Sequence, residues 1–388
     1  MTNMPSKRLL NPPQDSFFLI GPRATGKSTW LENQIKADLI IDLLKARDFQ
    51  KYSTHLSLLR EVVEGNPKYK TIVIDEIQKL PELLDEVHSL IFDSKGKIQF
   101  ILTGSSARKL KKQNVNLLAG RALLRHFHPF SLLEIEDKFN LTHALQFGML
   151  PHVWNLIDIE DKKDYLVSYV DLYLKEEIKQ EAAVRSLPSY ISFLEHFALR
   201  NGQVINIQNL SQEIGVPRTT LIGYLDILEQ TLLGFKLAPI QLKAKVKEVA
   251  TPKFYFFDTG VSRALAKKID DPISPEDKGF LLETYLLHEL KTYSDYYNQR
   301  WDFFYWGTPS ENEVDFIVTK GQNKIGIEVK STTKWNSKFN AGLNVLLESK
   351  KIKKAYGVYL GSEILKSEST MVYPVKDFVK KIFNGELF

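Results

Sequence analysis

The sequence predicts an α/β protein made of two or three domains. Short, continuously apolar segments such as 17–20 and 72–74 are typical of strands buried on both faces of a parallel sheet. Further along the chain, as in 165–178, apolar residues recur every three or four positions, which indicates amphipathic helices. The chain has 388 residues, and because single cores seldom grow beyond roughly 250–300 residues, we expect more than one domain.

The composition excludes several kinds of protein and site. No apolar run approaches the ~20 residues that span a bilayer, and the first residues lack the apolar core of a signal peptide, so we expect a cytoplasmic protein with no membrane partner. The chain has no Cys, which excludes disulfides, Cys-ligated zinc and thiol catalysis. A net charge of +5 only weakly favours nucleic acid binding, and local clusters of basic residues must support it.

The first element is an apolar strand that runs into a glycine-rich loop and then a helix, "FFLIGPRATGKSTW" at 17–30. Two glycines at this spacing, followed by Lys and Ser, let backbone N–H groups face phosphate oxygens. Lys27 would reach the terminal phosphates, and the Ser28 hydroxyl would coordinate Mg²⁺. We therefore predict binding of ATP and Mg²⁺. The residues expected to hold the nucleotide are Gly21, Pro22, Arg23, Ala24, Thr25, Gly26, Lys27, Ser28 and Thr29.

The next buried strand, "TIVID" at 71–75, carries two acids at its carboxyl end, where ligands bind in open α/β sheets. Asp75 would hold Mg²⁺ through water. Glu76 would orient or deprotonate the attacking water, a role that a hydrolysing ATPase needs. The alternative is that both carboxylates only cap the following helix.

A third buried strand, "KIQFILTGSS" at 97–106, ends in polar residues. Thr103 is the first choice for a residue that senses the γ-phosphate and Ser105 the second, with a simple strand-ending turn as the alternative. Strands at 38–44 and near 122–130 would complete a five-stranded sheet. This ATPase core is expected to cover residues 1–150.

Four segments of this core resemble the ATPase module of a widespread prokaryotic family of AAA-type ATPases that carries a C-terminal domain of unknown function. They are "GPRATGKST", "TIVIDEIQKLP", "FILTGSSARKL" and "LAGRALLRHFHPFSLLE", and the resemblance spans nearly the whole chain. It implies a homo-oligomer, in particular a hexameric ring, in which an Arg reaches the neighbour's ATP site. Arg121 matches that position, with Arg108 and Arg125 as rivals and a surface salt bridge as the alternative.

Residues 151–258 are predicted to form a helical lid followed by a winged helix. The lid would extend to about Arg200, and either Arg185 or Arg200 could supply a second ATP sensor. A helix through Ile214, a turn at 215–217 and a helix over 219–230 have helix-turn-helix spacing. Two apolar strands, "LLGFKLAPI" and "KFYFFD", then flank a basic stretch, which suggests the wing.

This winged helix is expected to bind DNA. The start of its second helix would enter the major groove, and lysines on the wing would contact phosphates, against the single acid Glu248. The alternative is a lid or a protein contact. The residues expected to contact DNA are Arg218, Thr219, Thr220, Tyr224, Lys243, Lys245, Lys247 and Lys253.

Beyond a polar linker at 267–278, residues 270–388 are predicted to form an α/β domain like the PD-(D/E)xK nucleases. The expected order is a helix with Glu283, a hairpin with Asp315 on its first strand and Glu328-Val329-Lys330 on its second, a helix and a further strand. Alternation along the second strand puts Glu328 and Lys330 on one face. The three acids could then hold Mg²⁺, with Lys330 beside the attacking water.

Two questions stay open at this point. The related family often has an Arg after the Tyr-Trp pair where this chain has Gly307, so the C-terminal domain either cleaves DNA or is an inert clamp that grips it. The leading hypothesis is an ATP-hydrolysing, oligomeric DNA-binding protein that remodels or processes DNA. The alternative is a nucleotide-controlled switch or scaffold that binds protein partners and carries an inactive nuclease fold.

Overall fold

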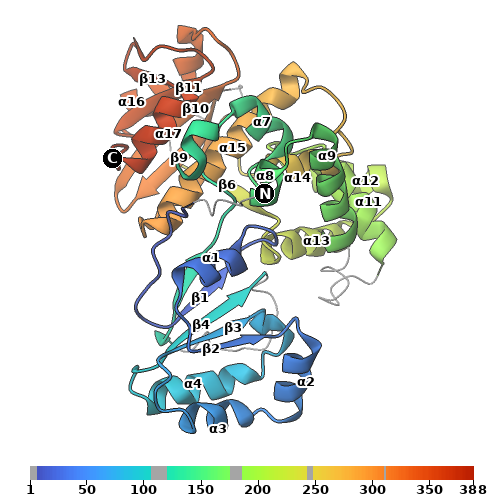
Figure 1. Cartoon of the computed structure of the whole chain (residues 1–388). Coiled ribbons are helices and arrows are strands. Elements are labelled where there is room, and N and C mark those ends of the chain that lie inside the picture. Colours follow the sequence, from blue (N-terminus) through green and yellow to red (C-terminus); the bar gives the residue numbers. More distant parts are fainter. Residues whose placement is uncertain (1–6, 106–119, 175–185, 243–247, 310–311) are drawn as a thin grey trace. The chain divides into compact units, whose positions relative to one another are not determined.

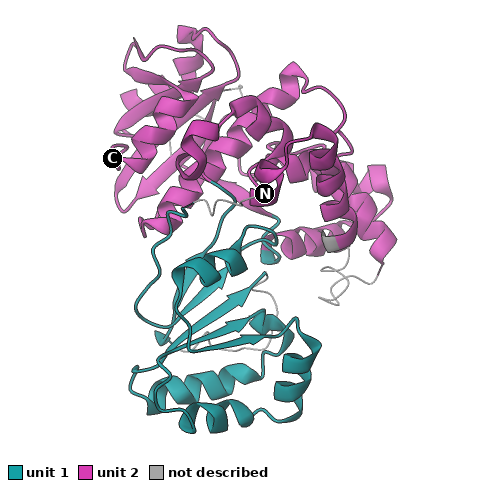
Figure 2. Ribbon diagram, in the orientation of Figure 1, with its two compact units in different colours: residues 1–130, 230–233 teal, residues 131–229, 234–388 magenta. Residues whose placement is uncertain are grey.

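The computed structural model describes residues 7–105, 120–174, 186–242, 248–309 and 312–388 (Figure 1). These residues divide into two compact units (Figure 2). Unit 1 comprises Met1–Phe130 and Gln230–Leu233, and unit 2 comprises Ser131–Glu229 and Gly234–Phe388.

Unit 1 contains the predicted five-stranded sheet. Its strands are β1 (Phe17–Ile20), β2 (Leu39–Asp42), β3 (Thr71–Asp75), β4 (Gln99–Gly104) and β5 (Leu123–His126). They run parallel in the order β2-β3-β4-β1-β5, so the prediction of five strands is confirmed. Because all strands are parallel, the residues that follow β1, β3 and β4 meet at one edge of the sheet.

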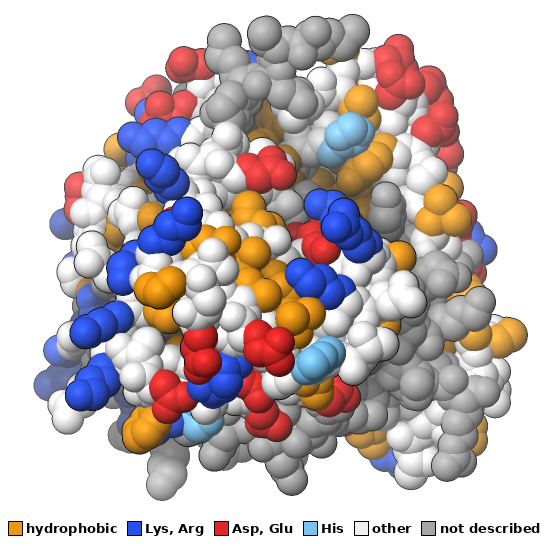
Figure 3. Space-filling view, turned by 60° about the horizontal axis from the view of Figure 1, so that its bottom comes forward, with side chains coloured by type: hydrophobic (Ala, Val, Ile, Leu, Met, Phe, Trp, Pro, Cys, Tyr) orange, Lys and Arg blue, Asp and Glu red, His pale blue; other side chains and the backbone are white. Residues whose placement is uncertain are grey.

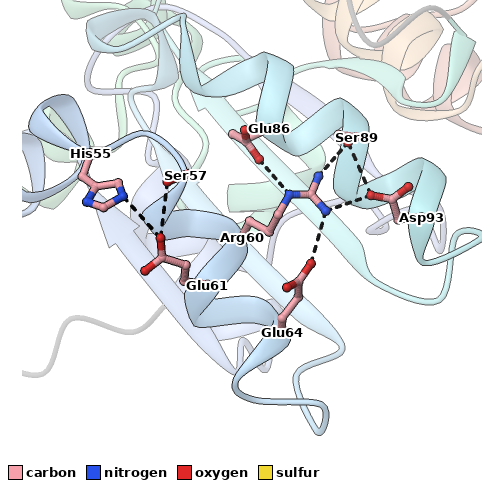
Figure 4. A network of polar contacts seen from close by, with 8 residues as sticks. All are labelled: His55, Ser57, Arg60, Glu61, Glu64, Glu86, Ser89 and Asp93. Atoms are coloured by element: carbon pink, nitrogen blue, oxygen red, sulfur yellow. Dashed lines mark hydrogen bonds and ion pairs between the residues drawn. The ribbon is translucent and has the colours of Figure 1, made fainter.

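Helices flank this sheet and connect its strands. They are α1 (Lys27–Gln34), α2 (Ala46–Thr54), α3 (Leu58–Glu64), the short η1 (Ile77–Lys79) and α4 (Leu83–Asp93). A buried core of aliphatic and aromatic side chains from strands and helices fills the unit. On its surface the Arg60 guanidinium joins α3 to α4, because it contacts Glu64, Glu86, Ser89 and Asp93 (Figure 4).

The first part of unit 2 is helical. Its helices are α6 (Leu132–Ile135), η3 (Glu136–Lys138), α7 (Leu141–Phe147), α8 (Pro151–Asn155), α9 (Ile159–Ser168), η4 (Tyr169–Leu174), α11 (Leu187–Ala198), α12 (Ile207–Ile214), α13 (Arg218–Gln230) and α14 (Thr259–Leu265). The predicted pair of helices around 215–217 is confirmed by α12 and α13. Gly215 ends α12 with φ 69°, a left-handed conformation that glycine adopts without strain.

The second part of unit 2 is built on an eight-stranded sheet in the order β12-β13-β11-β10-β9-β8-β6-β7. The strands are β6 (Gly234–Pro239), β7 (Lys253–Phe256), β8 (Asp302–Gly307), β9 (Glu313–Lys320), β10 (Asn323–Lys330), β11 (Lys354–Tyr359), β12 (Leu365–Ser367) and β13 (Thr370–Pro374). The helices of this part are α15 (Pro275–Tyr296), η5 (Ser337–Asn340), α16 (Ala341–Glu348) and α17 (Val375–Phe383). The predicted order of helix, hairpin, helix and strand is present as α15, β9–β10, α16 and β11.

The sheet of unit 2 contains strands from both sides of the segment 267–278, which the sequence suggested as a linker between domains. β6 and β7, expected to form a separate wing, pair with each other, and β6 also pairs with the C-terminal strand β8. Ala238 and Pro239 of β6 lie beside Phe304 and Tyr305 of β8. The strands predicted for the wing are therefore part of the C-terminal sheet.

The surface carries exposed hydrophobic side chains among charged ones, as Figure 3 shows for one face. In unit 1 these include Ile40, Leu44, Phe92 and Leu124. Among the described helices, none is both long and apolar enough to cross a membrane.

Candidate nucleotide site and a buried charged cluster

The glycine-rich loop lies between β1 and α1, at the carboxyl edge of the sheet of unit 1. Gly26 has φ 91°, and Ala24 has φ 61°. A Cβ on Gly21 would lie 2.2 Å from the carbonyl oxygen of Phe127, so only glycine fits there. The Gly21 N–H donates to the Gly104 carbonyl at 3.2 Å. This close approach fixes the start of the loop against the ends of the neighbouring strands.

The Lys27 side chain lies buried against this loop, with 6% of its surface exposed. Its Nζ donates hydrogen bonds to the carbonyl oxygens of Gly21 at 2.7 Å and Pro22 at 2.9 Å. The Thr25 hydroxyl donates to the same Pro22 oxygen at 2.9 Å. The loop therefore holds a buried ammonium group at the position where the sequence predicts contact with phosphates.

Three predicted residues meet at the ends of β3 and β4. The Ser28 hydroxyl donates to Asp75 Oδ2 at 3.2 Å, and the Thr103 hydroxyl donates to Asp75 Oδ1. These side chains offer the hard oxygen donors that Mg²⁺ prefers, so the residues fit the ion that the loop implies.

Glu76 follows directly, in the left-handed conformation with φ 59°. Its N–H donates to the Thr103 hydroxyl oxygen at 3.0 Å. Its Oε2 accepts hydrogen bonds from Gln78 Nε2 and from the Ser105 hydroxyl at 3.5 Å. A non-glycine residue in this conformation costs of order 1–3 kcal/mol and persists where surrounding contacts hold it. Glu76 is buried next to Asp75, and its contacts with Thr103, Gln78 and Ser105 hold it in this conformation.

Gln78 was not predicted as a site residue. Its side chain is 5% exposed, and its Oε1 has no hydrogen-bond partner among the described residues. The only signal in the sequence is an uncharged polar residue two positions after Glu76, between the core residues Ile77 and Leu80.

Arg8 is a second contact that the sequence did not reveal. Its guanidinium donates to the Thr25 carbonyl of the loop at 2.8 Å and to the His128 carbonyl at 2.5 Å. It also lies over the Phe127 ring, with 4.1 Å from Cζ to the ring centroid. Arg8 therefore connects the phosphate loop to the chain that follows β5.

Arg121 lies just before the amino end of β5. Since β5 is parallel to β1, this is the edge of the sheet opposite the phosphate loop. Its guanidinium contacts His88 and lies 5.1 Å from the ring centroid of Phe92 on α4. Arg121 also lines an open groove of 530 Å³. Arg121 therefore lies away from the phosphate loop of the same chain.

The other candidate arginines differ in their surroundings. Arg125 lies within β5 beside Leu19, and burial lowers the pKa of its guanidinium. Arg200 is bonded to the His196 carbonyl and to Glu213. Arg108 and Arg185 lie outside the described residues.

The amino end of α13 exposes part of the predicted DNA contact. Arg218 and Thr219 are exposed, and Thr220 is half-buried. Tyr224 is different, because it is only 5% exposed and packs edge to face on Tyr190 with ring centroids 4.9 Å apart. The expectation that Tyr224 contacts DNA was wrong, since its ring belongs to the core. Lys243, Lys245 and Lys247 lie outside the described residues.

Lys253 is also placed differently from the expectation of an exposed wing lysine. It belongs to β7 and is only 4% exposed, so it cannot contact a DNA phosphate at the surface. Its Nζ is bonded to Glu313 and lies 4.0 Å from Glu283 Oε2. The lysine therefore enters a charged cluster that also contains the acids predicted for the C-terminal site.

Glu283 of α15 and Glu328 of β10 are both buried in this cluster. Glu283 accepts a hydrogen bond from the Tyr255 hydroxyl at 2.6 Å. Burial, together with the negative charge of Asp315, raises the pKa of Glu283 to about 8. The same two causes raise the pKa of Glu328 well above its usual value. Burial and the charge of Asp315 therefore disfavour the ionised forms of both carboxyl groups, although Lys253 and Lys330 lie nearby.

Lys330 and Asp315 complete the predicted set. Lys330 Nζ lies 2.5 Å from Glu328 Oε1. Burial alone would lower the pKa of Lys330, but the neighbouring Asp315 and Glu328 raise it. Asp315 Oδ2 accepts a hydrogen bond from the Val329 N–H at 2.7 Å. The structure thus brings the four predicted residues together, and adds Lys253, Glu313 and Tyr255.

The fit of a metal ion to this cluster is partial. Across the described ranges, no group of three or more His, Asp or Glu side chains has an arrangement that could hold a metal. Glu283 faces Lys253 and Tyr255, which competes with the role of metal ligand expected for it. Glu328 Oε2, however, is buried and has no hydrogen-bond partner. A buried carboxylate oxygen without a partner is costly, and a hard cation shared with Asp315 would satisfy it.

Gly307, where the related family often has an Arg, ends β8 and pairs with Glu313 of β9. A Cβ at this position would meet ordinary van der Waals contacts, the nearest 3.5 Å away on Tyr305. The glycine is therefore not required by close packing.

Models of three known domains match successive parts of the chain. Residues 14–136 match the AAA domain, residues 138–271 a domain of unknown function (DUF8612), and residues 278–378 a second domain of unknown function (DUF4143). Together with the loop, the parallel sheet and the Asp-Glu pair, the first match identifies an AAA-type P-loop ATPase domain. The predicted ATPase module is thereby confirmed, and the nuclease-like fold stays a prediction.

Similar proteins extend over most of the chain. An uncharacterized protein of Mycobacterium tuberculosis is 24% identical over 330 residues, which cover 81% of this chain and 70% of that protein. An uncharacterized protein of Methanocaldococcus jannaschii is 26% identical over 431 residues, covering 96% and 86%. A structure of the replication initiator DnaA bound to AMPPCP and single-stranded DNA aligns with 57% of this chain and 83% of its own, at 16% identity and a TM-score of 0.29. A TM-score this low supports no transfer of function.

Proposed function

We propose that this protein is a Mg²⁺-dependent ATPase that assembles with copies of itself and uses ATP to grip and remodel DNA. The observation that carries the proposal is the group of Ser28, Asp75, Glu76 and Thr103 at the edge of the sheet, beside the buried Lys27. A protein that only binds nucleotide needs no carboxylate such as Glu76 next to the metal ligand.

Each residue of this group has a chemical role in hydrolysis. Lys27 exchanges its two carbonyl partners for oxygens of the terminal phosphates. Ser28 and Asp75 would hold Mg²⁺, which when bound would neutralise charge on the terminal phosphates. Glu76 accepts a proton from the attacking water. Thr103, which contacts both Asp75 and the Glu76 N–H, connects the metal ligand to the base.

Arg121 supplies the cation that a neighbouring subunit's site needs. Arg121 lies at the edge of the sheet opposite the phosphate loop of its own chain. It can therefore stabilise the charge on the transferred phosphoryl group only in another copy of the protein. The exposed Phe92 beside it, with 65% of its surface accessible, and the groove that both line offer apolar area for that contact.

DNA contact in unit 2 is proposed for two surfaces. The exposed start of α13, with Arg218 and Thr219, has the chemistry of a recognition helix. The second surface is an open groove of 620 Å³ beyond the end of β10, which Lys334, Trp335 and Tyr359 line. Two aromatic rings beside a lysine suit stacking of unpaired bases and contact with a phosphate.

The C-terminal cluster gives a second candidate activity, metal-dependent DNA cleavage. The unpartnered Glu328 Oε2 and the nearby Lys330 favour it. With a metal on the carboxylates, Lys330 would stabilise charge on the attacked phosphate. If the cluster does not cleave DNA, the C-terminal domain would only bind it.

The test is ATP turnover with and without single-stranded, duplex and branched DNA, together with binding at several salt concentrations. Wild type should hydrolyse ATP faster with DNA, and its DNA affinity should fall steeply with salt. Lys27→Ala and Glu76→Gln should lose turnover, whereas Lys36→Ala, on an exposed lysine just after α1, should keep it. ATP turnover that is indifferent to every DNA, with no salt-sensitive binding, rejects the proposal in favour of a switch that acts on protein partners.

Cleavage is scored in the same mixtures with Mg²⁺ or Mn²⁺. Loss of cutting in Lys330→Ala with DNA binding retained supports a nuclease. Equal behaviour of wild type and Asp315→Ala in every cleavage assay shows an inert grip.

A further inference from the structure

The buried cluster of unit 2 contains more acids than bases. Four carboxylates, those of Glu283, Glu313, Asp315 and Glu328, face two ammonium groups, those of Lys253 and Lys330. With all six groups ionised the cluster has a net charge of −2, although the charge of Glu313 is partly solvated because 40% of its side chain is exposed. Buried charges that remain unbalanced are costly, and one divalent cation would balance these.

The two lysines serve different halves of the cluster. Lys253 comes from β7, is bonded to Glu313 and lies 4.0 Å from Glu283. Lys330 ends β10 and lies 2.5 Å from Glu328. Asp315 of β9 interacts electrostatically with both lysines. We therefore distinguish two halves of the cluster. One half contains Lys253, Glu283 and Glu313, and the other contains Lys330, Glu328 and Asp315.

The half around Glu328 contains a buried carboxylate oxygen that has no partner among the described residues. Glu283 receives the Tyr255 hydroxyl and faces Lys253. Glu328, which is 5% exposed, offers Oε2 without a hydrogen-bond partner. Its carboxylate is close enough to Asp315 for the two charges to interact. A divalent ion between these two carboxylates would gain Glu328 Oε2 as a ligand, an oxygen that has no hydrogen-bond partner among the described residues.

We propose that Lys253 is a built-in cation that fills the half of the cluster formed by Glu283 and Glu313, so that the cluster binds one divalent metal ion, on Asp315 and Glu328, rather than two. The chemical use of this ion rests on the proposed function, but its binding does not. Two-metal nucleases place two ions roughly 3.5–4 Å apart. In this protein a lysine from the strand before α14 replaces one of them.

The proposal predicts how many ions bind. All measurements use the full chain without nucleotide or DNA, in an Asp75→Asn background that removes the ligand of the ATP site. Mn²⁺ binding is followed by calorimetry and by electron paramagnetic resonance of free Mn²⁺. The starting protein should bind one ion in unit 2, and Glu328→Gln should weaken it by at least about tenfold because a charged ligand is lost.

Lys253→Met should raise the number of bound ions from one to two, since Glu283 and Glu313 then lack a cation. The matched control is Lys253→Met with Glu283→Gln, which removes one charge of each sign and should return the number to one. This double variant also guards against misfolding, because removing one partner of a buried pair is strongly destabilising whereas removing both is not.

A starting protein that binds two ions or none overturns the proposal, as does Lys253→Met that folds and still binds one. If Lys253→Met fails to fold, a folded double variant must still bind one ion, and any other number also overturns the proposal. These results are independent of ATP turnover and DNA binding. The proposed function can therefore fail while the single metal site stands, and the reverse also holds.

Discussion

Arg8 is expected to order the phosphate loop, and its removal should weaken both unit 1 and ATP binding. The guanidinium donates to the Thr25 carbonyl at 2.8 Å, to the His128 carbonyl at 2.5 Å and, more weakly, to the Pro129 carbonyl at 3.4 Å. It also lies over the Phe127 ring. A hydrogen bond to a charged group contributes about 1.5–3 kcal/mol, and a cation–π contact about 0.5–1 kcal/mol at an exposed site.

These values give the size of the effect. Arg8 is half-buried, so solvent screening reduces the sum, and Arg8→Ala should destabilise unit 1 by about 2–4 kcal/mol. If about 1.4 kcal/mol of this cost falls on the loop that carries Thr25, ATP affinity drops about tenfold. The turnover number should change less, because Arg8 contacts none of Asp75, Glu76 or Thr103 in the described contacts.

The assay combines urea unfolding with the affinity for a fluorescent ATP analogue. Lys7→Ala is the matched control, because Lys7 is an exposed cation next to Arg8 and its loss should change neither quantity. Arg8→Lys keeps the charge without the fork that reaches two carbonyls and should fall between alanine and wild type. If Arg8→Ala leaves both stability and ATP affinity within about 0.5 kcal/mol of wild type, the contact is incidental.

Three further predictions concern single side chains. Burial raises the pKa of Asp258 from 3.8 to about 6. Because the folded state binds this proton more tightly than the unfolded state, the protonated carboxyl stabilises the fold. This contribution to the free energy of unfolding is complete below pH 4 and is lost as the pH rises through 6. Urea unfolding should thus show ~3 kcal/mol of pH dependence that is absent in Asp258→Asn. Gln78→Leu removes the amide that donates to Glu76. If this contact restrains Glu76 until DNA binds, the ratio of ATP turnover with DNA to turnover without it should move toward one, and an unchanged ratio contradicts such a restraint. Arg121→Ala should be inactive alone yet regain part of its turnover when mixed with Glu76→Gln, because mixed assemblies combine an intact Glu76 with an intact Arg121, and no recovery contradicts action in trans.

The nucleotide site could be predicted from the sequence because its signals are local. The loop is a continuous motif, and each buried strand ends in its functional residue, so strand order brings Lys27, Asp75 and Thr103 together once the sheet is parallel. Tyr224 could also have been placed correctly. It shares a helical face with the core residues Leu221, Leu225 and Leu228, and this spacing contradicts an exposed role.

Arg8 and Lys253 could not be found in this way, because their partners are distant in sequence. Arg8 reaches a carbonyl 120 residues away, and Lys253 reaches Glu313, 60 residues away. A lysine near three others in the sequence favours an exposed basic surface. Pairing of β6 with β8 reverses that expectation, since it brings β7 into the sheet beside the helix that carries Glu283.

This sheet also changes which part of unit 2 is available for the proposed contact with DNA. A wing hairpin that is free in solution can enter a groove, but β6 and β7 are held by ladder hydrogen bonds and by the Lys253 ion pairs. Under the proposed function, direct contact with bases would therefore fall to the exposed start of α13, and contact with unpaired bases to the groove around Trp335. The strands that follow α13 supply Lys253, so α13 and the charged cluster are connected through β6 and β7. We therefore expect DNA bound at α13 to act on the cluster through these two strands rather than through a flexible linker.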